Sequence, residues 1–166
     1  GLVSHENQKL HRMGGEKSEM DVLETIHSLI RTNDVCVLST VFEGKPHCSL
    51  MSYVVDDECR EFYMITRPGS MKYRNLEQNG SVSLLIDSRE QEPDGRREGI
   101  RALTVSGEFR KIADGKKEKE ILALLLDRNP HLREFAEKGA ASVFAVRVKT
   151  LQLLEGVDRS HFVEVQ

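Results

Sequence analysis

The chain of 166 residues is poor in aromatic side chains, with no tryptophan, three tyrosines and six phenylalanines. Any hydrophobic core must therefore be built mainly from valine, leucine and isoleucine. The longest apolar run, residues 121–126, is far below the about 20 residues that a membrane-spanning helix needs. The chain also lacks a basic N-terminal segment followed by an apolar one. We therefore expect neither a secretory signal nor a membrane span.

The chain has no excess of positive charge, since 24 lysines and arginines stand against 27 aspartates and glutamates. The net charge of −3 gives no reason to expect a nucleic acid partner. The three cysteines, Cys36, Cys48 and Cys59, are odd in number, lack C-x-x-C spacing, and two of them fall in predicted strands. This favours reduced, buried thiols in a cytoplasmic protein over a disulfide framework or a metal site. A catalytic cysteine stays open, because spacing alone assigns no activating neighbour.

Hydrophobic periodicity predicts a polar N-terminal tail over residues 1–17 and one domain over residues 18–166. Six β-rich runs are expected, and they cover residues 34–42, 46–55, 61–66, 81–87, 100–113 and 142–154. Helices are expected over residues 18–31, 70–79, 116–128 and 131–138, and residues 155–166 form a C-terminal extension. The pattern predicts a mainly β protein, a closed or nearly closed antiparallel barrel with peripheral helices.

The charged segment 88–99 separates two of these strands. It has two interpretations. The first is a solvated loop, and the second is a flap that brings Arg96 or Arg97 near a functional site.

The most informative stretch is ITRPGSMKYRNL, residues 65–76. Pro68-Gly69 predicts a type II turn, which needs a positive φ at the glycine. Ser70 then fits the N-cap of a helix whose first N–H groups point outward. Because Thr66, Arg67 and Lys72 surround that helix end, the stretch predicts a phosphate site.

This stretch and its neighbours also carry a resemblance. The segments VCVLSTVFEGKPHCSLMSYVV, FYMITRPGSMKYRNL and NGSVSLLID resemble the pyridoxamine 5'-phosphate oxidase-like family, the FMN-binding split barrels. The resemblance implies a six-stranded antiparallel split β-barrel that forms a homodimer with FMN at the subunit interface. It places the cofactor phosphate at Thr66, Arg67, Ser70 and Lys72, with Ile65 beside them. It places the isoalloxazine along Ser49, Leu50, Met51 and Ser52.

The chain departs from the oxidase proper in two ways. Its C-terminus, VDRSHFVEVQ, lacks the Arg-Leu-His pattern that helps hold pyridoxal phosphate there, and it has no tryptophan to close over the flavin. We therefore expect a flavin-dependent oxidoreductase acting on an unassigned small organic substrate. The alternatives are a non-catalytic flavin-binding or sensor module, and a relative that binds haem or a deazaflavin.

The sequence does not assign a catalytic acid or base. His47, beside the hairpin on the flavin-side strand, is the best candidate for a polar group near the site, and an ordinary surface position is the competing interpretation. Haem would need an axial donor such as His47 or His161.

Overall fold

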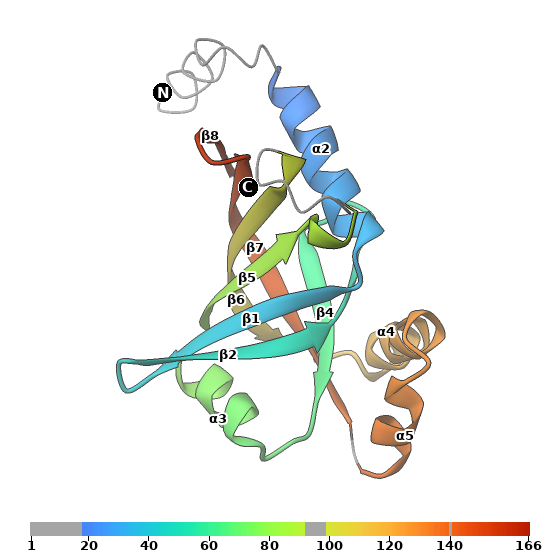
Figure 1. Cartoon of the computed structure of the whole chain (residues 1–166). Helices are drawn as coiled ribbons and strands as arrows, with labels where there is room; N and C mark the ends of the chain where they lie inside the picture. Colours follow the sequence, from blue (N-terminus) through green and yellow to red (C-terminus); the bar gives the residue numbers. More distant parts are fainter. Residues whose placement is uncertain (1–17, 92–98, 140) are drawn as a thin grey trace.

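A computed structural model describes residues 18–91, 99–139 and 141–166 of the chain (Figure 1). The predicted tail 1–17 and Arg96 and Arg97 of the predicted loop lie outside the described residues. The helices are α2 (Glu19–Thr32), α3 (Met71–Gln78), α4 (Gly115–Arg128) and α5 (Leu132–Glu137), with a 3-10 turn, η1 (Arg89–Gln91). The strands are β1 (Val35–Phe42), β2 (Lys45–Ser52), β3 (Val54–Val55), β4 (Glu61–Thr66), β5 (Ser81–Asp87), β6 (Arg101–Lys111), β7 (Ser142–Glu155) and β8 (Arg159–Glu164).

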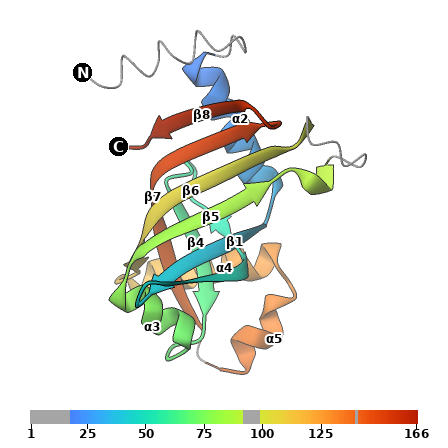
Figure 2. The same cartoon turned by 60° about the vertical axis from the view of Figure 1, so that its left-hand side comes forward.

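The strands form one antiparallel sheet in the order β2-β1-β5-β6-β7-β4-β3, and β8 pairs with β7. β2 and β3 stand at opposite ends of this order, yet only Tyr53 separates them in the chain. The sheet therefore curls back on itself, as Figures 1 and 2 show, with a split where β2 and β4 are not paired. This confirms the prediction of a mainly β, split-barrel fold with peripheral helices.

The number of strands differs from the expected six. The predicted strand 46–55 is divided at Tyr53, because β2 before it pairs with β1 and β3 after it pairs with β4. The Tyr53 N–H donates to the Asp34 carbonyl at 2.9 Å. Its hydroxyl donates to the Ile30 carbonyl at 2.6 Å. The C-terminal extension adds β8, which pairs with β7 from Glu155↔Arg159 to Thr150↔Glu164.

Local signals in the sequence account for several turns and crossings. The β1–β2 hairpin has a two-residue loop, Glu43-Gly44, with φ of 51° and 72°, as a type I′ turn requires. Gly107 lies where the register of β6 against β7 shifts, as expected for a bulge. A Cβ at this glycine would lie 2.5 Å from the Arg147 carbonyl oxygen, so the close approach of the two strands requires glycine.

Helix α2 closes one end of the curled sheet. Ser18 caps it through the predicted capping box, in which Ser18 Oγ accepts from the Asp21 N–H at 3.2 Å and Asp21 accepts from the Ser18 N–H. Its buried face packs against the main core, which is lined by β-strand side chains such as Leu38 and Phe62. A second, smaller cluster joins α4 and α5 to the outside of β4 and β7. Of the helices among the described residues, none is long and apolar enough to cross a bilayer.

Candidate functional site

The turn before α3 has the predicted geometry. The Ser70 N–H donates to the Arg67 carbonyl at 3.1 Å, and Gly69 has a φ of +80°, as the third position of a type II turn needs. Ser70 is the N-cap of α3, and its Oγ accepts from the Tyr73 N–H at 3.1 Å. The same oxygen lies 3.3 Å from Thr66 Oγ1 at the end of β4. Two hydroxyls thus converge at the N-terminus of α3.

A cavity of about 510 Å³ opens beside this turn. It lies at the split, where the free edge of β2 faces the end of β4. Its lining residues are Val35, Leu50, Met51, Ser52, Ile65, Thr66, Arg67, Ser70, Lys72, His131, Leu132 and Phe135. Of the expected site residues the structure brings together all but Ser49, which pairs with the buried Leu38 and does not line the cavity.

Two cationic side chains line the cavity, and no carboxylate in the described ranges pairs with either of them. Lys72 Nζ lies 3.2 Å from the Met51 sulfur, a weak acceptor. The Arg67 guanidinium lies over the Phe135 ring, 5.1 Å from its centroid. Within the described parts of the chain, neither has an ion pair. Burial lowers the pKa of the Lys72 ammonium, because the charged form is poorly solvated there.

Helix α5 supplies a wall of the cavity that the sequence does not reveal. His131, just before the helix, and Leu132 and Phe135 within it line one side. His131 Nε2 lies 3.3 Å from Ser52 Oγ on β2, and Phe135 contacts Arg67, so this wall touches both β2 and the Pro68-Gly69 turn. Only the Pro130 break and the four-residue spacing of His131 and Phe135 hint at a shared face, and neither says what that face meets.

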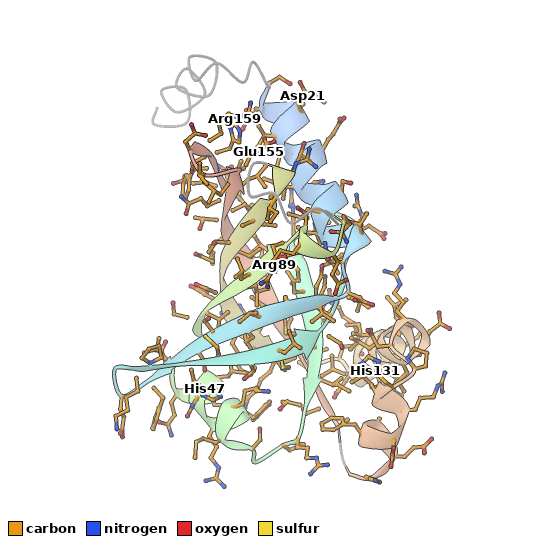
Figure 3. The ribbon with its side chains drawn as sticks, in the orientation of Figure 1. Asp21, His47, Arg89, His131, Glu155 and Arg159 are labelled. Atoms are coloured by element: carbon orange, nitrogen blue, oxygen red, sulfur yellow. The ribbon has the colours of Figure 1, made fainter. Side chains whose placement is uncertain are left out.

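The other polar candidates lie elsewhere. His47 is exposed near the hairpin end of β2 and is not among the lining residues, and Figure 3 shows it well apart from His131. His161 is buried beside Glu155, with Nε2 3.2 Å from Oε1, at the α2 end of the barrel. Neither of the expected haem donors therefore reaches this cavity.

The cysteines do not contribute to the cavity. All three are free thiols, and Cys36 and Cys59 are buried as expected, whereas Cys48 is exposed. The prediction of three buried thiols is wrong for Cys48, because it lies on the outer face of β2 opposite Ser39. Burial raises the pKa of Cys36 to about 12 and also raises that of Cys59, so both stay protonated and unreactive.

Comparison with known proteins agrees with the fold. Residues 22–155 match the family model described as pyridoxamine 5'-phosphate oxidase. The chain belongs to this family. A search of curated proteins finds no match.

Solved structures similar to this pyridoxamine 5'-phosphate oxidase family member share its fold at low sequence identity. A haem-binding protein from Mycobacterium smegmatis is 19% identical with a TM-score of 0.71, and the match covers 86% of this chain and 57% of that one. General stress protein 26 from Bacillus anthracis is 20% identical with a TM-score of 0.62, over 87% of this chain and 98% of that one. A FAD-binding protein from Mesorhizobium loti is 18% identical with a TM-score of 0.62, over 78% and 91%.

Proposed function

We propose that the chain binds FMN in the cavity between β2, α3 and α5, and that it is a flavin-dependent oxidoreductase for a small organic substrate. One observation carries the proposal. Two cations, Arg67 and Lys72, lie beside the hydroxyls at the N-terminus of α3, and no carboxylate of the described residues pairs with them. Lys72 is half-buried, where an uncompensated charge costs free energy, and Arg67 is exposed beside it, so the pair favours an anionic ligand.

The residues present fit a phosphate monoester at one end of the cavity. Ser70 already caps α3, Thr66 is buried beside it, and the first N–H groups of the helix face an anion favourably. Arg67 would hold the phosphate through its planar donors and Lys72 as a point charge.

The rest of the cavity fits a planar ring. Leu50, Met51 and Ser52 come from a strand edge whose backbone groups have no second strand to pair with among the described residues. Leu132 and Phe135 give an apolar surface opposite. A bound flavin would supply the electron or hydride transfer, and the chain would hold and orient it. A non-catalytic flavin carrier would use the same residues, so turnover with a reduced nicotinamide, above the rate of free FMN, is what separates the two roles.

The test is a paired titration with FMN and riboflavin, which differ only in the phosphate. We expect Lys72→Met and Arg67→Ala each to weaken FMN binding about tenfold or more, because each removes a charge-assisted hydrogen bond. Riboflavin binding should stay nearly the same. Quenching of flavin fluorescence measures both. No FMN binding by the folded wild type, or equal losses for both ligands, would overturn the assignment.

We further propose that a second copy of the chain covers the outer face of the sheet. Figures 1 and 2 show no described helix over this face of β1, β5 and β6. The middle row of this face follows the register of six paired strands and is uncharged: Leu50, Val37, Leu85, Thr104, Gln152 and Phe162. The row begins at Leu50, which is 75% exposed and lines the cavity. A partner on this face would therefore border the flavin.

Three free thiols favour a reducing compartment, which is why we place the dimer in the cytoplasm.

A charge in the middle of that row tests the dimer. Leu85→Arg should convert the dimer into a monomer and should weaken FMN binding. Light scattering after size-exclusion chromatography measures the molar mass. Val157→Arg is the matched control, because Val157 is 65% exposed in the β7–β8 turn, outside the row. A wild type that is monomeric at micromolar concentration contradicts the dimer.

Haem is a second candidate ligand, and His131 is the observation that favours it. An imidazole lies at a cavity with apolar walls and two cations that suit carboxylates. Protein prepared with haem available would then show a Soret band that His131→Ala weakens, and no saturable FMN binding.

A further inference from the structure

We propose that His131 is the hydrogen-bonding contact for the ring end of the ligand in this cavity, and that Ser52 holds it in place. This inference rests on the proposed flavin site and adds a positioning residue that the sequence motif does not contain. The geometry of α5 defines the two ends of the cavity, and His131 lies at the end away from the phosphate turn.

The two ends are marked by two separate contacts of one helical wall. Phe135 lies under the Arg67 guanidinium, so it marks the phosphate end. His131 lies four residues earlier, about 6 Å along the helix axis, and its Nε2 contacts Ser52 Oγ at 3.3 Å. Ser52 ends the strand edge along which a ring would lie. A ligand whose phosphate meets Arg67 therefore extends along α5 toward His131.

The hydrogen-bonding capacity of His131 is only partly used. Its side chain has the Ser52 contact through one ring nitrogen, and no described residue bonds the other. A neutral imidazole carries one donor and one acceptor, so the second nitrogen can serve a ligand heteroatom. The neighbouring wall residues Leu132 and Phe135 are apolar and cannot. His131 is thus the polar group of this wall.

The wall itself does not depend on His131. Leu132 and Phe135 pack against the cluster formed by Ile121 and Leu125 of α4 with β4 and β7. His131 is exposed, so replacing it removes a contact at the rim and leaves this packing in place. A loss of ligand affinity in His131 variants can therefore be separated from a loss of fold by measuring the melting temperature.

The experiment crosses variants at the two ends of the cavity with two ligands. His131→Leu should weaken FMN and riboflavin equally, by about two- to tenfold, which corresponds to one lost hydrogen bond. Lys72→Met should weaken FMN alone. His131→Gln keeps a polar end at similar reach and should restore most of the affinity. His131→Leu should also shift the visible absorption of the bound flavin, because it changes the polarity at the ring.

Two further variants sharpen the assignment. Arg133→Ala is the matched control, since Arg133 is exposed on α5 and does not line the cavity, and it should leave both affinities unchanged. If Ser52 acts through His131, then Ser52→Ala should weaken both ligands in the wild type and have little further effect in His131→Leu.

The outcomes separate this inference from the flavin proposal. If the wild type binds neither flavin, the proposed function fails. If it binds both and His131→Leu binds them as the wild type does, or loses FMN alone, the assignment of His131 to the ring end is wrong while the flavin site stands.

Discussion

The two ends of the barrel differ in whether their charged side chains have partners of opposite charge. At the α2 end, Glu155 is 10% exposed and has cationic or hydrogen-bonding partners on both neighbouring strands. Its Oε2 lies 3.6 Å from Arg101 Nε on β6, and its Oε1 lies 3.2 Å from His161 Nε2 on β8. At the other end, beside α3 and α5, Arg67 and Lys72 share a cavity in which no described carboxylate reaches them. Figure 3 shows Glu155 and His131 at these opposite ends.

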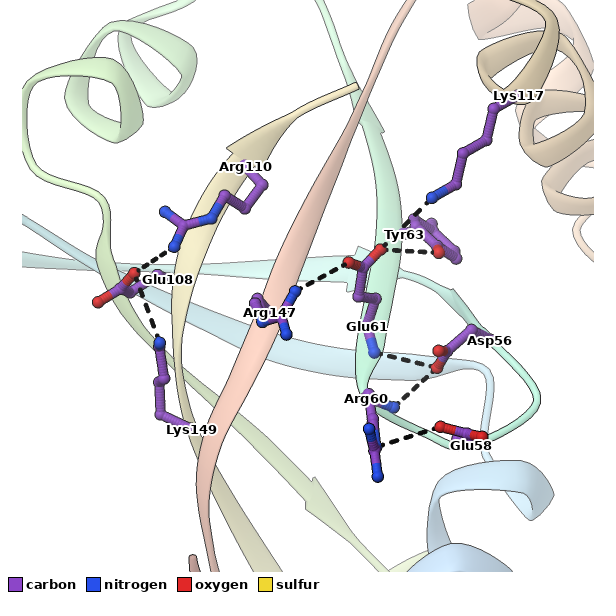
Figure 4. Close-up of polar contacts among 10 residues, drawn as sticks. All are labelled: Asp56, Glu58, Arg60, Glu61, Tyr63, Glu108, Arg110, Lys117, Arg147 and Lys149. Atoms are coloured by element: carbon purple, nitrogen blue, oxygen red, sulfur yellow. Dashed lines mark hydrogen bonds and ion pairs between the residues drawn. The ribbon is translucent and has the colours of Figure 1, made fainter. Parts of the chain in front are cut away.

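Two carboxylates on the sheet surface are paired in the same way as Glu155. Figure 4 shows Glu61 on β4 between Lys117 at 3.9 Å and Arg147 at 4.0 Å, with the Tyr63 hydroxyl donating to it at 2.8 Å. Glu108 on β6 is paired in the same way, 2.8 Å from Arg110 and 4.0 Å from Lys149. These carboxylates each lie between two cations, whereas Arg67 and Lys72 share one cavity in which no described carboxylate reaches them. Under the proposed function, the phosphate of the ligand takes that place.

The larger effect on stability is expected from replacing Glu155, the paired carboxylate at the α2 end. Glu155→Leu leaves the buried His161 without its hydrogen-bond partner and Arg101 without its carboxylate. We expect the free energy of unfolding to fall by about 2 kcal/mol, the cost of an unsatisfied buried polar group. Urea denaturation measures the change, and the affinity for FMN should be that of the wild type.

The same substitution on an exposed site of β8 gives the control. Glu164→Leu removes a carboxylate that faces solvent next to Thr150, and should change stability by no more than about 0.5 kcal/mol. If Glu155→Leu is as mild as this control, the paired end does not stabilise the fold and the contrast between the two ends is lost.

The sequence predicts the end of the cavity beside α3, because the residues that form it lie close together in the chain. The turn at Pro68-Gly69, the Ser70 cap and the placement of Arg67 and Lys72 all follow from residues within one stretch, so propensity and capping rules are enough to find them. β2 joins that stretch only through the sheet, and here the family resemblance, not periodicity, pointed to Leu50, Met51 and Ser52.

What the sequence misses depends on contacts between distant segments. His131 and Ser52 are 79 residues apart, and their contact follows from how α4 and α5 pack on β4, which no local pattern encodes. His47 fits the local expectation of a polar group on the right strand, but it lies near the hairpin, away from the cavity. The sequence also does not reveal β8, because its apolar residues alternate only over a short span and pairing with β7 decides its conformation.

A smaller effect is expected from the titration of Lys72, one of the two cations at the cavity. It tests the same difference between the two ends of the barrel. Because burial lowers the pKa of Lys72, the folded chain releases this proton at a lower pH than the unfolded chain does. In the window between the two pKa values, below the ordinary value of about 10.4 for lysine, the unfolded state binds more protons. The stability of the ligand-free protein should therefore gain from this residue as pH rises.

Ligand binding should respond to the same titration with the opposite sign. Only the ammonium form of Lys72 attracts a phosphate, so FMN affinity should fall through this window while riboflavin affinity stays level. Other lysines and tyrosines titrate at alkaline pH too, so the quantity to follow is the difference between wild type and Lys72→Met, by flavin titration and by urea denaturation at each pH. If FMN affinity falls equally in the variant, the alkaline loss does not come from Lys72, and the unpaired cation at the cavity is not what holds the phosphate.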